Sequence, residues 1–141
     1  MAADDLDAVM EIERGAFPSS WRWADFVACI QTKGCEAHVA MRGPTVVGFV
    51  VWEIRDGALH VMNLAVHSDQ RRQGIGTRLV KHVAQRLDPS RCGYACLEVR
   101  ETNLTAQLFY RQLGFKARRV LRSHYPDTGE DAYLMEYWPV D

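Results

Sequence analysis

The spacing of apolar residues divides this chain into helical and extended segments. Near the start, apolar residues recur every three or four positions, which predicts one helix over residues 4–17 and a second over residues 21–30. An aspartate pair precedes the first apolar position, and Pro18-Ser19-Ser20 ends the first helix. The chain is therefore expected to begin with two short helices joined by a tight connection.

Three extended segments follow these helices. Residues 36–41 alternate between apolar and polar side chains, and residues 46–54 and 58–66 are longer apolar runs. Residues 42–45 form a turn sequence, and Asp56-Gly57 is a hairpin signal. Because the connections are this short, we expect three neighbouring antiparallel strands.

The second half of the chain alternates between strands and helices. The strand over residues 58–66 leads through a polar loop to a glycine-rich turn, and Leu79, Val83 and Leu87 continue from there at helical spacing. Gly114 stands where the C-terminal glycine cap of a further helix belongs. The remaining predicted elements are a strand at 94–99, a helix at 103–113, and strands at 116–125 and 132–138.

These patterns predict an α/β fold in which a central mixed, mostly antiparallel sheet is flanked by about four helices. A length of 141 residues suits one domain, so residues 1–141 are expected to form a single one. The formal net charge of −1 gives no bulk attraction to nucleic acid or to a membrane, and neither is expected as a partner. The four cysteines form no Cys-x-x-Cys pair, and there is no signal peptide or long apolar span, so reduced thiols in a cytoplasmic protein are expected.

The turn Gly74-Ile75-Gly76 is the first candidate for a ligand site. Backbone N–H groups at a helix start lack intrahelical partners, the helix dipole favours anions there, and glycines permit close approach. Arg71-Arg72 adds positive charge, so the expected ligand is a phosphate or pyrophosphate. The turn is no P-loop, because Thr77 follows without a lysine, and no dinucleotide fingerprint, because Leu79 takes the place of the third glycine. An ordinary helix start with solvated arginines remains the alternative.

The pattern Arg71-x-x-Gly74-x-Gly76 after a strand resembles the acyl-CoA loop of the GNAT N-acetyltransferase superfamily. Three further segments resemble the same superfamily in the same order. Together with the loop they are similar to the RimI-like group, the ribosomal-protein-alanine N-acetyltransferases, over about residues 4–137. The three segments are Leu97-Glu98-Val99-Arg100 followed by Thr102-Asn103, Leu108-Phe109-Tyr110-Arg111-Gln112-Leu113-Gly114-Phe115, and His124-Tyr125-Pro126 followed by Glu130-Asp131-Ala132 and Met135.

Two features depart from that group. Its members usually open with a short strand before the first helix, whereas this chain begins directly at the helix. Either the first strand of a GNAT-like fold is missing, which exposes an edge of the sheet, or the true start of the protein lies upstream of Met1. The group's Tyr-Tyr-Pro is His124-Tyr125-Pro126 here, so the match is looser at the substrate end of the site.

The resemblance implies transfer of an acetyl group from acetyl-CoA to an amine by direct attack in a ternary complex. The implied acceptor is the N-terminal α-amine of a protein such as a ribosomal protein. Glu98 is then the general base, directly or through a water, and Tyr110 is the general acid. The residues alone leave other interpretations open: Glu98 as an outward-facing glutamate paired with Arg100 or with a neighbouring strand, and Tyr110 as a core aromatic.

The resemblance also implies how acetyl-CoA is held. Residues 64–66 offer backbone groups to the pantetheine arm, and a backbone N–H near Leu64 stabilises the developing oxyanion. Asn103 hydrogen-bonds the pantetheine, or simply caps its helix. The implied cofactor-binding residues are Leu64, Ala65, Val66, Arg71, Arg72, Gln73, Gly74, Ile75, Gly76, Thr77, Asn103 and Tyr110.

The substrate end is expected at the loop of residues 17–21 and at residues 125–131. The implied substrate-binding residues are Phe17, Trp21, Tyr125 and Asp127. The acidic side chains of Asp127, Glu130 and Asp131 either attract a cationic amine or form a solvated acidic turn. No histidine spacing predicts a metal site.

Two other functions stay open from the sequence. The acceptor could be a lysine side chain or a small-molecule amine, because fold and cofactor site do not separate these from an α-amine. Alternatively, the chain could be a non-catalytic acetyl-CoA-binding module, which the missing first strand favours and the presence of Glu98 and Tyr110 disfavours. In each case we expect a monomer or weak homodimer.

Overall fold

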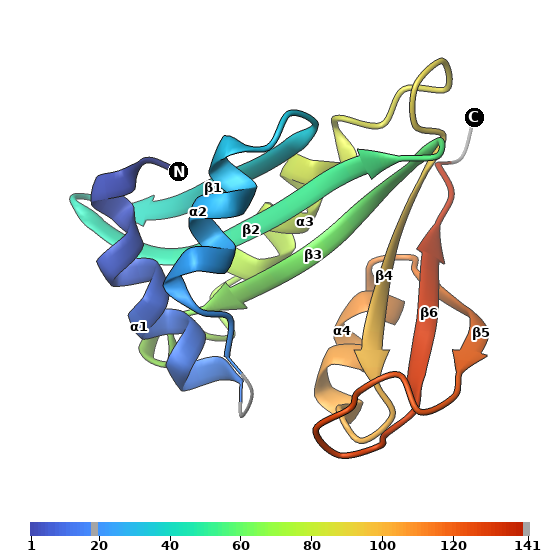
Figure 1. Ribbon diagram of the computed structural model, residues 1–141. Helices are drawn as coiled ribbons and strands as arrows, with labels where there is room; N and C mark the ends of the chain where they lie inside the picture. The colour runs from blue at the N-terminus through green and yellow to red at the C-terminus, as the bar shows by residue number, and fades with distance from the viewer. Residues whose placement is uncertain (18–19, 140–141) are drawn as a thin grey trace. The chain divides into compact units, whose positions relative to one another are not determined.

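The computed structural model describes residues 1–17 and 20–139, in which we find six strands, four α-helices and two short 3₁₀ helices at Ala3–Asp5 and Ser68–Gln70 (Figure 1). The α-helices are α1 (Leu6–Ala16), α2 (Trp23–Gln31), α3 (Ile75–Ala84) and α4 (Leu104–Gln112). The strands are β1 (Cys35–Arg42), β2 (Thr45–Arg55), β3 (Ala58–Val66), β4 (Tyr94–Arg100), β5 (Lys116–Leu121) and β6 (Ala132–Tyr137).

The six strands form a mixed sheet with the order β1-β2-β3-β4-β6-β5. The pairs β1–β2, β4–β6 and β5–β6 are antiparallel, whereas β3 and β4 are parallel. The β3–β4 ladder is short and runs from the pair Ala58↔Tyr94 to the pair His60↔Cys96. The prediction of an α/β fold with a mixed, mostly antiparallel sheet and four helices is confirmed.

Contacts divide the chain into two compact units. The first unit contains residues 1–54 and 61–86, and the second contains residues 55–60 and 87–141. Strand β3 contributes to both units, because its first three residues belong to the second unit and the rest to the first.

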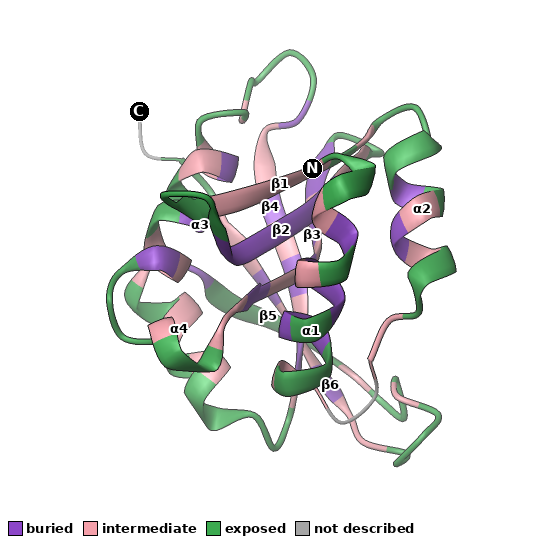
Figure 2. Ribbon diagram, turned by 90° about the vertical axis from the view of Figure 1, so that its left-hand side faces the viewer, coloured by how far each residue is buried: buried purple, intermediate pink, exposed green. Residues whose placement is uncertain are grey.

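In the first unit, α1 and α2 cover one face of the strands and α3 covers the other (Figures 1 and 2). Residues 46–52 of β2 are consecutively buried, because both faces of this strand are covered. An unbroken apolar run is the sequence that such a strand requires. Gly48 permits close packing here, since a Cβ at this position would lie only 3.1 Å from the Ala65 carbonyl oxygen. On the other face, the Phe26 ring of α2 meets Phe49 edge-on at 5.5 Å.

In the second unit, the register of β4 and β6 decides which side chains share a face. Leu97 lies opposite Met135, and both are buried, as is Val99. Because successive residues of a strand point to opposite faces, Glu98 and Arg100 project from the other face of β4. One face of β4 therefore carries the apolar side chains of Leu97 and Val99, and the opposite face carries the charged side chains of Glu98 and Arg100.

Most predicted elements are confirmed to within one or two residues, and the strand predicted over residues 58–66 coincides with β3. Two predicted ends are wrong. Helix α3 ends at Ala84, so Leu87 does not continue it and lies in the irregular segment before the Asp88–Cys92 bridge. Strand β5 ends at Leu121, because Ser123 takes a φ of +50° and turns the chain. The four cysteines are free thiols, as expected.

The start of the chain forms no strand within the described residues. A single 3₁₀ turn leads directly into α1, as predicted from the departure from the family pattern. Strand β1 is at one edge of the sheet formed by the described strands, and the Met1 amino group donates a hydrogen bond to its Ala37 carbonyl at 2.8 Å.

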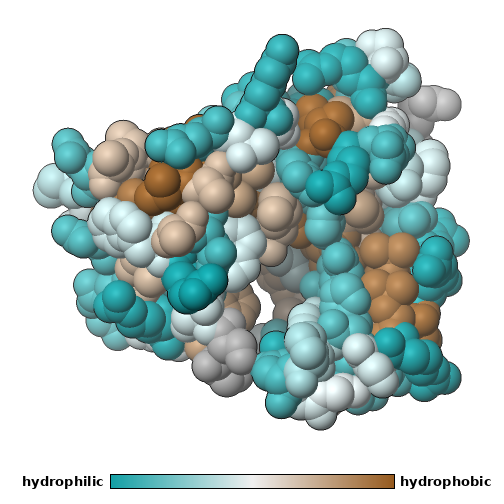
Figure 3. All heavy atoms as spheres, viewed as in Figure 1, coloured by the Kyte–Doolittle hydropathy of each residue, from teal (hydrophilic) through white to brown (hydrophobic). Residues whose placement is uncertain are grey.

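The visible surface is mostly hydrophilic, with small separate apolar areas (Figure 3). None of the described helices is long and apolar enough to cross a membrane.

Candidate active site

The start of α3 has the geometry of an anion-binding turn. Gly74 is the N-cap residue with a φ of +81°, a conformation that favours glycine. Within the described part of the chain, no side chain caps α3, and its first turn carries no acidic residue. The N–H groups and the positive end of the helix dipole therefore stay available to a ligand. This donor set fits a phosphate group.

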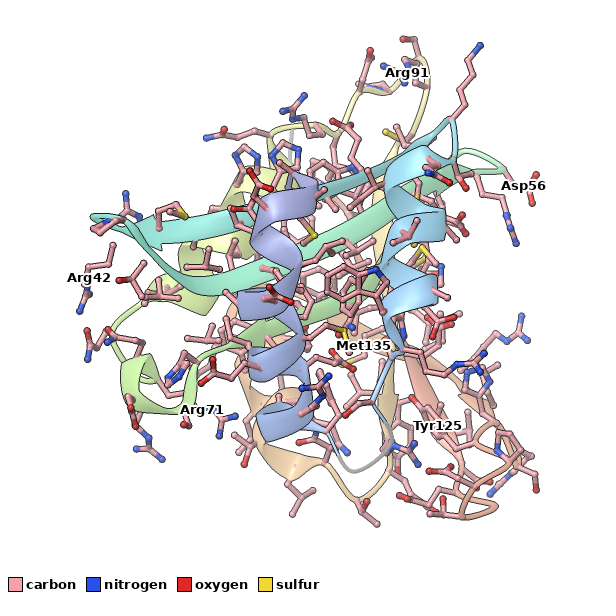
Figure 4. All side chains as sticks on the ribbon, turned by 60° about the vertical axis from the view of Figure 1, so that its left-hand side comes forward. Arg42, Asp56, Arg71, Arg91, Tyr125 and Met135 are labelled. Atoms are coloured by element: carbon pink, nitrogen blue, oxygen red, sulfur yellow. The ribbon has the colours of Figure 1, made fainter. Side chains whose placement is uncertain are left out.

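Arginines surround this turn. Arg71 and Arg72 are exposed beside it, and Arg71 Nε donates to the Val66 carbonyl at 3.4 Å. Arg42, the last residue of β1, is a further arginine here, and its Nη1 donates to Gln70 Oε1 at 2.7 Å. Figure 4 shows Arg42 and Arg71 at the same end of the first unit. The sequence analysis missed Arg42, because a contact between positions 28 residues apart leaves no local signal.

The residues predicted to line the pantetheine arm end β3 and lead into the turn. Ala65 is buried, and Leu64 and Val66 are half-buried. Ile75 is 9% exposed and packs into the core, so only its backbone can serve a ligand. The remaining predicted members of the turn are Gln73, Gly76 and Thr77, which the structure places at or just before the first turn of α3.

Glu98 lies in the middle of β4 and accepts a hydrogen bond from a neighbouring strand. Its Oε2 lies 2.6 Å from Nε2 of His60 on β3. The Glu98 side chain is 21% exposed. Arg100, the other candidate partner, instead binds Asp127 and Glu130. His60 is a functional candidate that the sequence analysis missed, although a histidine within an apolar strand is a signal for one.

The two predicted residues of the α4 segment differ in their surroundings. Asn103 is the N-cap of α4, and its Oδ1 accepts from the Ala106 N–H at 3.1 Å, which confirms the capping interpretation. The Asn103 amide nitrogen remains able to donate to a ligand. Tyr110 packs between Phe109 and Phe115, with ring centroids at 5.0 and 5.5 Å. Burial raises the pKa of the Tyr110 phenol well above its usual value, so the group stays protonated and able to donate.

Arg100 organises the loop after β5. Its guanidinium carbon lies 3.9 Å from the centroid of the Tyr125 ring, a cation–π contact. Its two terminal nitrogens donate to both Asp127 carboxylate oxygens at 3.2 and 3.0 Å, and one of them also donates to Glu130 at 3.2 Å. Burial raises the pKa of the Tyr125 phenol. Tyr125 and Asp127 thus both contact the Arg100 guanidinium, which lies between them.

The other acidic side chains of this loop are also bonded within it. Hydrogen bonds from Thr102 and then from Thr128 hold the pKa of the Glu130 carboxyl below its usual value. The Ser123 N–H does the same for the pKa of Asp131. The acidic side chains of this turn are thus hydrogen-bonded to one another's partners while remaining close to solvent, so the turn is both solvated and internally bonded.

Phe17 and Trp21, predicted for the substrate side, are both half-buried and belong to the first unit. Between them, residues 18–19 lie outside the described residues. The Trp21 ring packs on Phe26 at 5.0 Å, and its backbone N–H donates to Glu13 Oε2 at 2.8 Å. Glu13 is only 1% exposed. The sequence analysis missed it, although a charged residue within the apolar stripe of a helix is a detectable signal.

The described residues also form two hollows, one in each unit. A hollow of about 320 Å³ beside α3 is lined by Arg42 and Arg78 among others, and one of about 920 Å³ beside α4 includes Leu108. Neither includes Glu98 or Tyr110. Over residues 1–17 and 20–139, no group of three or more histidine, cysteine or acidic side chains is arranged to hold a metal ion.

The sequence matches a family model described as the acetyltransferase (GNAT) family over residues 6–115. This range includes the glycine turn, Glu98 and Tyr110. The chain belongs to the GNAT acetyltransferase family and is an N-acetyltransferase, an enzyme of the acyltransferase class.

Its relatives cover nearly the whole chain. An uncharacterized N-acetyltransferase of Methanocaldococcus jannaschii is 36% identical over 95% of this chain and 86% of its own length. An N-alpha-acetyltransferase of Saccharolobus solfataricus is 32% identical over 94% of this chain and 86% of its own. The ribosomal protein bS18-alanine N-acetyltransferase of Escherichia coli K12 is 30% identical over 93% of this chain and 89% of its own.

Solved structures share the fold. The ribosomal-protein-S18-alanine N-acetyltransferase from Escherichia coli superposes with a TM-score of 0.86 at 27% identity, over 98% of this chain and 90% of that one. Arabidopsis thaliana NAA60, solved in complex with acetyl-CoA, gives a TM-score of 0.85 at 21% identity, over 98% and 95% of the two chains. The resemblance predicted from sequence motifs is confirmed by both kinds of comparison.

Proposed function

We propose that residues 1–141 act as one N-acetyltransferase domain that transfers an acetyl group from acetyl-CoA to the N-terminal α-amine of a protein, such as a ribosomal protein. The observation that carries this proposal is Glu98, a half-buried carboxylate between the buried apolar residues Leu97 and Val99 on β4 of a GNAT-family chain. The choice of an α-amine is supported by relatives named N-alpha-acetyltransferase and ribosomal protein bS18-alanine N-acetyltransferase, which align with 94% and 93% of this chain.

Acetyl-CoA supplies an acetyl group activated as a thioester. The free N–H groups around Gly74, with the charge of Arg71 and Arg72, hold the pyrophosphate. Backbone groups of residues 64–66 run beside the pantetheine arm, and a backbone N–H near Leu64 stabilises the negative charge that develops on the carbonyl oxygen. The side-chain amide of Asn103 donates a further hydrogen bond.

Glu98 removes the proton that keeps the acceptor amine cationic, directly or through a water. An α-amine has a pKa of about 7.7–8.0 and a lysine amine about 10.4, a difference of about 2.5 units or about 3.5 kcal/mol. Because the α-amine gives up its proton more readily, one carboxylate suffices for it, whereas a lysine acceptor needs further help. This difference supports an N-terminal acceptor.

Tyr110 completes the reaction by protonating the departing thiolate. Burial raises the pKa of its phenol, so the side chain carries its proton at every physiological pH. The aromatic contacts with Phe109 and Phe115 fix the ring without using the hydroxyl group. Tyr110 can therefore pack as a core aromatic residue and also act as the general acid.

The acceptor peptide is received by Phe17, Trp21 and Tyr125, whose rings offer apolar contact area. Asp127 is not proposed to attract the cationic amine of the acceptor directly. Because both of its oxygens bind Arg100, its part is to fix the loop that carries Tyr125.

The test compares initial rates of acetyl transfer to a peptide that begins with alanine. We expect Glu98→Gln to lower kcat by about 100-fold or more, and Tyr110→Phe to lower it by about tenfold or more, since general acid–base groups contribute on this scale. Glu11→Gln on the exposed face of α1 is the matched control and should turn over like the parent protein. Thermal melting of each variant separates loss of chemistry from loss of fold.

Unchanged turnover in both variants would show that the roles of Glu98 and Tyr110 are wrong. Acetyl-CoA binding without transfer to any α-amine, lysine or small amine would instead favour a non-catalytic binding module.

A further inference from the structure

Phe17 and Trp21, which receive the acceptor peptide in the proposed function, belong to the segment between α1 and α2. Glu13, near the end of α1, binds this segment through both its backbone and its side chain. Its carbonyl accepts from the Phe17 N–H at 3.2 Å, and its carboxylate Oε2 accepts from the Trp21 N–H at 2.8 Å. The Ser20 hydroxyl group also donates to the Glu13 carbonyl, at 3.4 Å. A single residue of the helix therefore holds the described part of this segment.

The other carboxylate oxygen of Glu13 binds strand β3. Asn63 Nδ2 donates to Oε1 at 2.7 Å. Glu13 is 1% exposed and Asn63 is 8% exposed, so water competes little for this bond. Asn63 immediately precedes Leu64, where the proposed function places the N–H that stabilises the developing oxyanion. Glu13 thus links the acceptor segment to that position on the strand, and all of these residues belong to the first unit.

Core packing alone does not explain a carboxylate at this position. The other buried residues of α1 are all apolar. An ionised group among them lowers stability unless hydrogen bonds compensate for its lost hydration. Burial raises the pKa of the Glu13 carboxyl, and the bonds from Trp21 and Asn63 oppose that rise. Because an apolar side chain has no acceptor for either donor, the two donors account for the glutamate.

We propose that Glu13 is a positioning residue for the acceptor peptide. By binding Trp21 with one oxygen and Asn63 with the other, it fixes the acceptor segment relative to Leu64. This inference rests on the proposed function, because it takes the segment to receive the peptide and the acetyl carbonyl to lie at Leu64. A segment that is ordered in advance spares the peptide the loss of freedom that ordering it on binding entails. Glu13 acts through its two partners and exchanges no proton in the reaction.

Replacement of the carboxylate tests this role. Glu13→Met keeps the length of the side chain and removes both acceptors. Because the peptide must then order the acceptor segment itself, we expect KM for a peptide that begins with alanine to rise by about tenfold. KM for acetyl-CoA should stay within about twofold of the parent value, since the change does not touch the glycine turn of α3. Glu11→Met, at a side chain that is 76% exposed on the same helix, is the matched control and should leave both KM values unchanged.

A double variant separates the loss of positioning from the loss of stability. In Glu13→Met the Asn63 amide stays buried without its acceptor, which lowers the melting temperature. Adding Asn63→Leu, a change of similar side-chain size, makes this contact apolar on both sides and should return the melting temperature toward that of the parent protein. The Trp21 N–H still lacks its acceptor in the double variant, so KM for the peptide should remain about tenfold above the parent value.

The outcomes distinguish this inference from the proposed function. Peptide KM values within about twofold of the parent in both variants, or an equal rise of both KM values, would overturn the positioning role. A peptide KM that recovers together with the melting temperature in the double variant would assign Glu13 to stability alone and would overturn it as well. The double variant decides the question by itself if Glu13→Met does not fold. If the parent protein transferred no acetyl group to the peptide, the proposed function would fail first and this inference with it.

Discussion

Asn63 and Glu13 are hydrogen-bonded in the interior of the first unit, with Asn63 Nδ2 donating to Glu13 Oε1 at 2.7 Å. The second carboxylate oxygen of Glu13 accepts from the Trp21 backbone N–H at 2.8 Å. The buried Glu13 side chain of α1 therefore connects Trp21, a candidate substrate residue, to Asn63 on β3, which precedes Leu64. We infer that Glu13 keeps these two parts of the first unit in register with each other.

Replacement of Glu13 tests this link. Glu13→Gln keeps an oxygen acceptor for Asn63, but its amide group cannot accept from the Trp21 N–H. One buried donor is left unpaired, so we expect the free energy of unfolding to fall by about 1–3 kcal/mol. Urea unfolding measures the change, and Glu11→Gln on the exposed face of the same helix should change it by less than about 0.5 kcal/mol. Equal free energies of unfolding for Glu13→Gln and Glu11→Gln would show that the hydrogen bonds of Glu13 do not stabilise the fold.

Glu13 also predicts a dependence of stability on pH. Burial raises the pKa of its carboxyl above the ordinary value of 4.5, so the folded state favours the protonated form. Protonated Glu13 therefore stabilises the folded state fully at pH values below the pKa that its carboxyl has in the unfolded chain. This stabilisation is lost as the pH rises through the higher pKa of the folded state. From pH 4.5 upward, the stability advantage of the parent protein over Glu13→Gln should therefore shrink and then level off. Parallel stability curves for the two proteins over this window would contradict the raised pKa.

The acidic loop after β5 gives a prediction about the acceptor peptide. Arg100→Lys removes the paired hydrogen bonds to Asp127 and the guanidinium that stacks on Tyr125. We expect KM for the peptide to rise by about tenfold, because an ammonium group does not replace a bidentate, stacked guanidinium, whereas KM for acetyl-CoA stays unchanged. Arg122→Lys changes the other arginine that pairs with an acidic side chain of this loop, and it is the control because the Arg122 side chain is 80% exposed. A parallel rise of both KM values, or equal effects in the two variants, would contradict a role confined to the acceptor side.

The glycine turn gives a prediction about acetyl-CoA. Gly74 and Gly43 both have positive φ angles, +81° and +59°, and open space where a Cβ would stand. Alanine at either position should cost about 1 kcal/mol of stability, since a side chain disfavours this backbone conformation. Only Gly74→Ala should also raise KM for acetyl-CoA, by about tenfold, because the new methyl group separates a phosphate from the N–H groups of α3. Equal KM values in the two variants would place the pyrophosphate elsewhere.

Sequence patterns predicted the parts of this protein that depend on neighbours in the chain. Strand β3 was predicted to the residue because a hairpin signal and a polar loop bound it on either side. The end of α3 was missed by three residues, since Leu87 fits the helical spacing although the helix ends at Ala84. Local patterns thus predict where an element exists better than where it ends.

The partners of the site residues depend on contacts across the sheet and were not predictable in the same way. Glu98 stood out as a carboxylate in an apolar strand, but the His60 that binds it is 38 positions away and is brought to it by strand register. The pairing of Arg100 with Asp127 spans 27 positions, so the sequence did not reveal that this acidic turn is also hydrogen-bonded to an arginine. Glu13 could have been singled out from its place in the apolar stripe of α1, but its partner Asn63 lies 50 positions away and was equally unpredictable.

The central claim is that this chain acetylates a protein N-terminus with Glu98 as base. The most direct measurement offers the protein and acetyl-CoA one peptide that starts with a free alanine and contains an internal lysine, and locates the acetyl group by fragment-ion mass spectrometry. The account predicts acetylation of the α-amine alone, lost in Glu98→Gln and retained in Glu11→Gln. Acetylation of the lysine alone, or of the α-amine at an unchanged rate in Glu98→Gln, would contradict it.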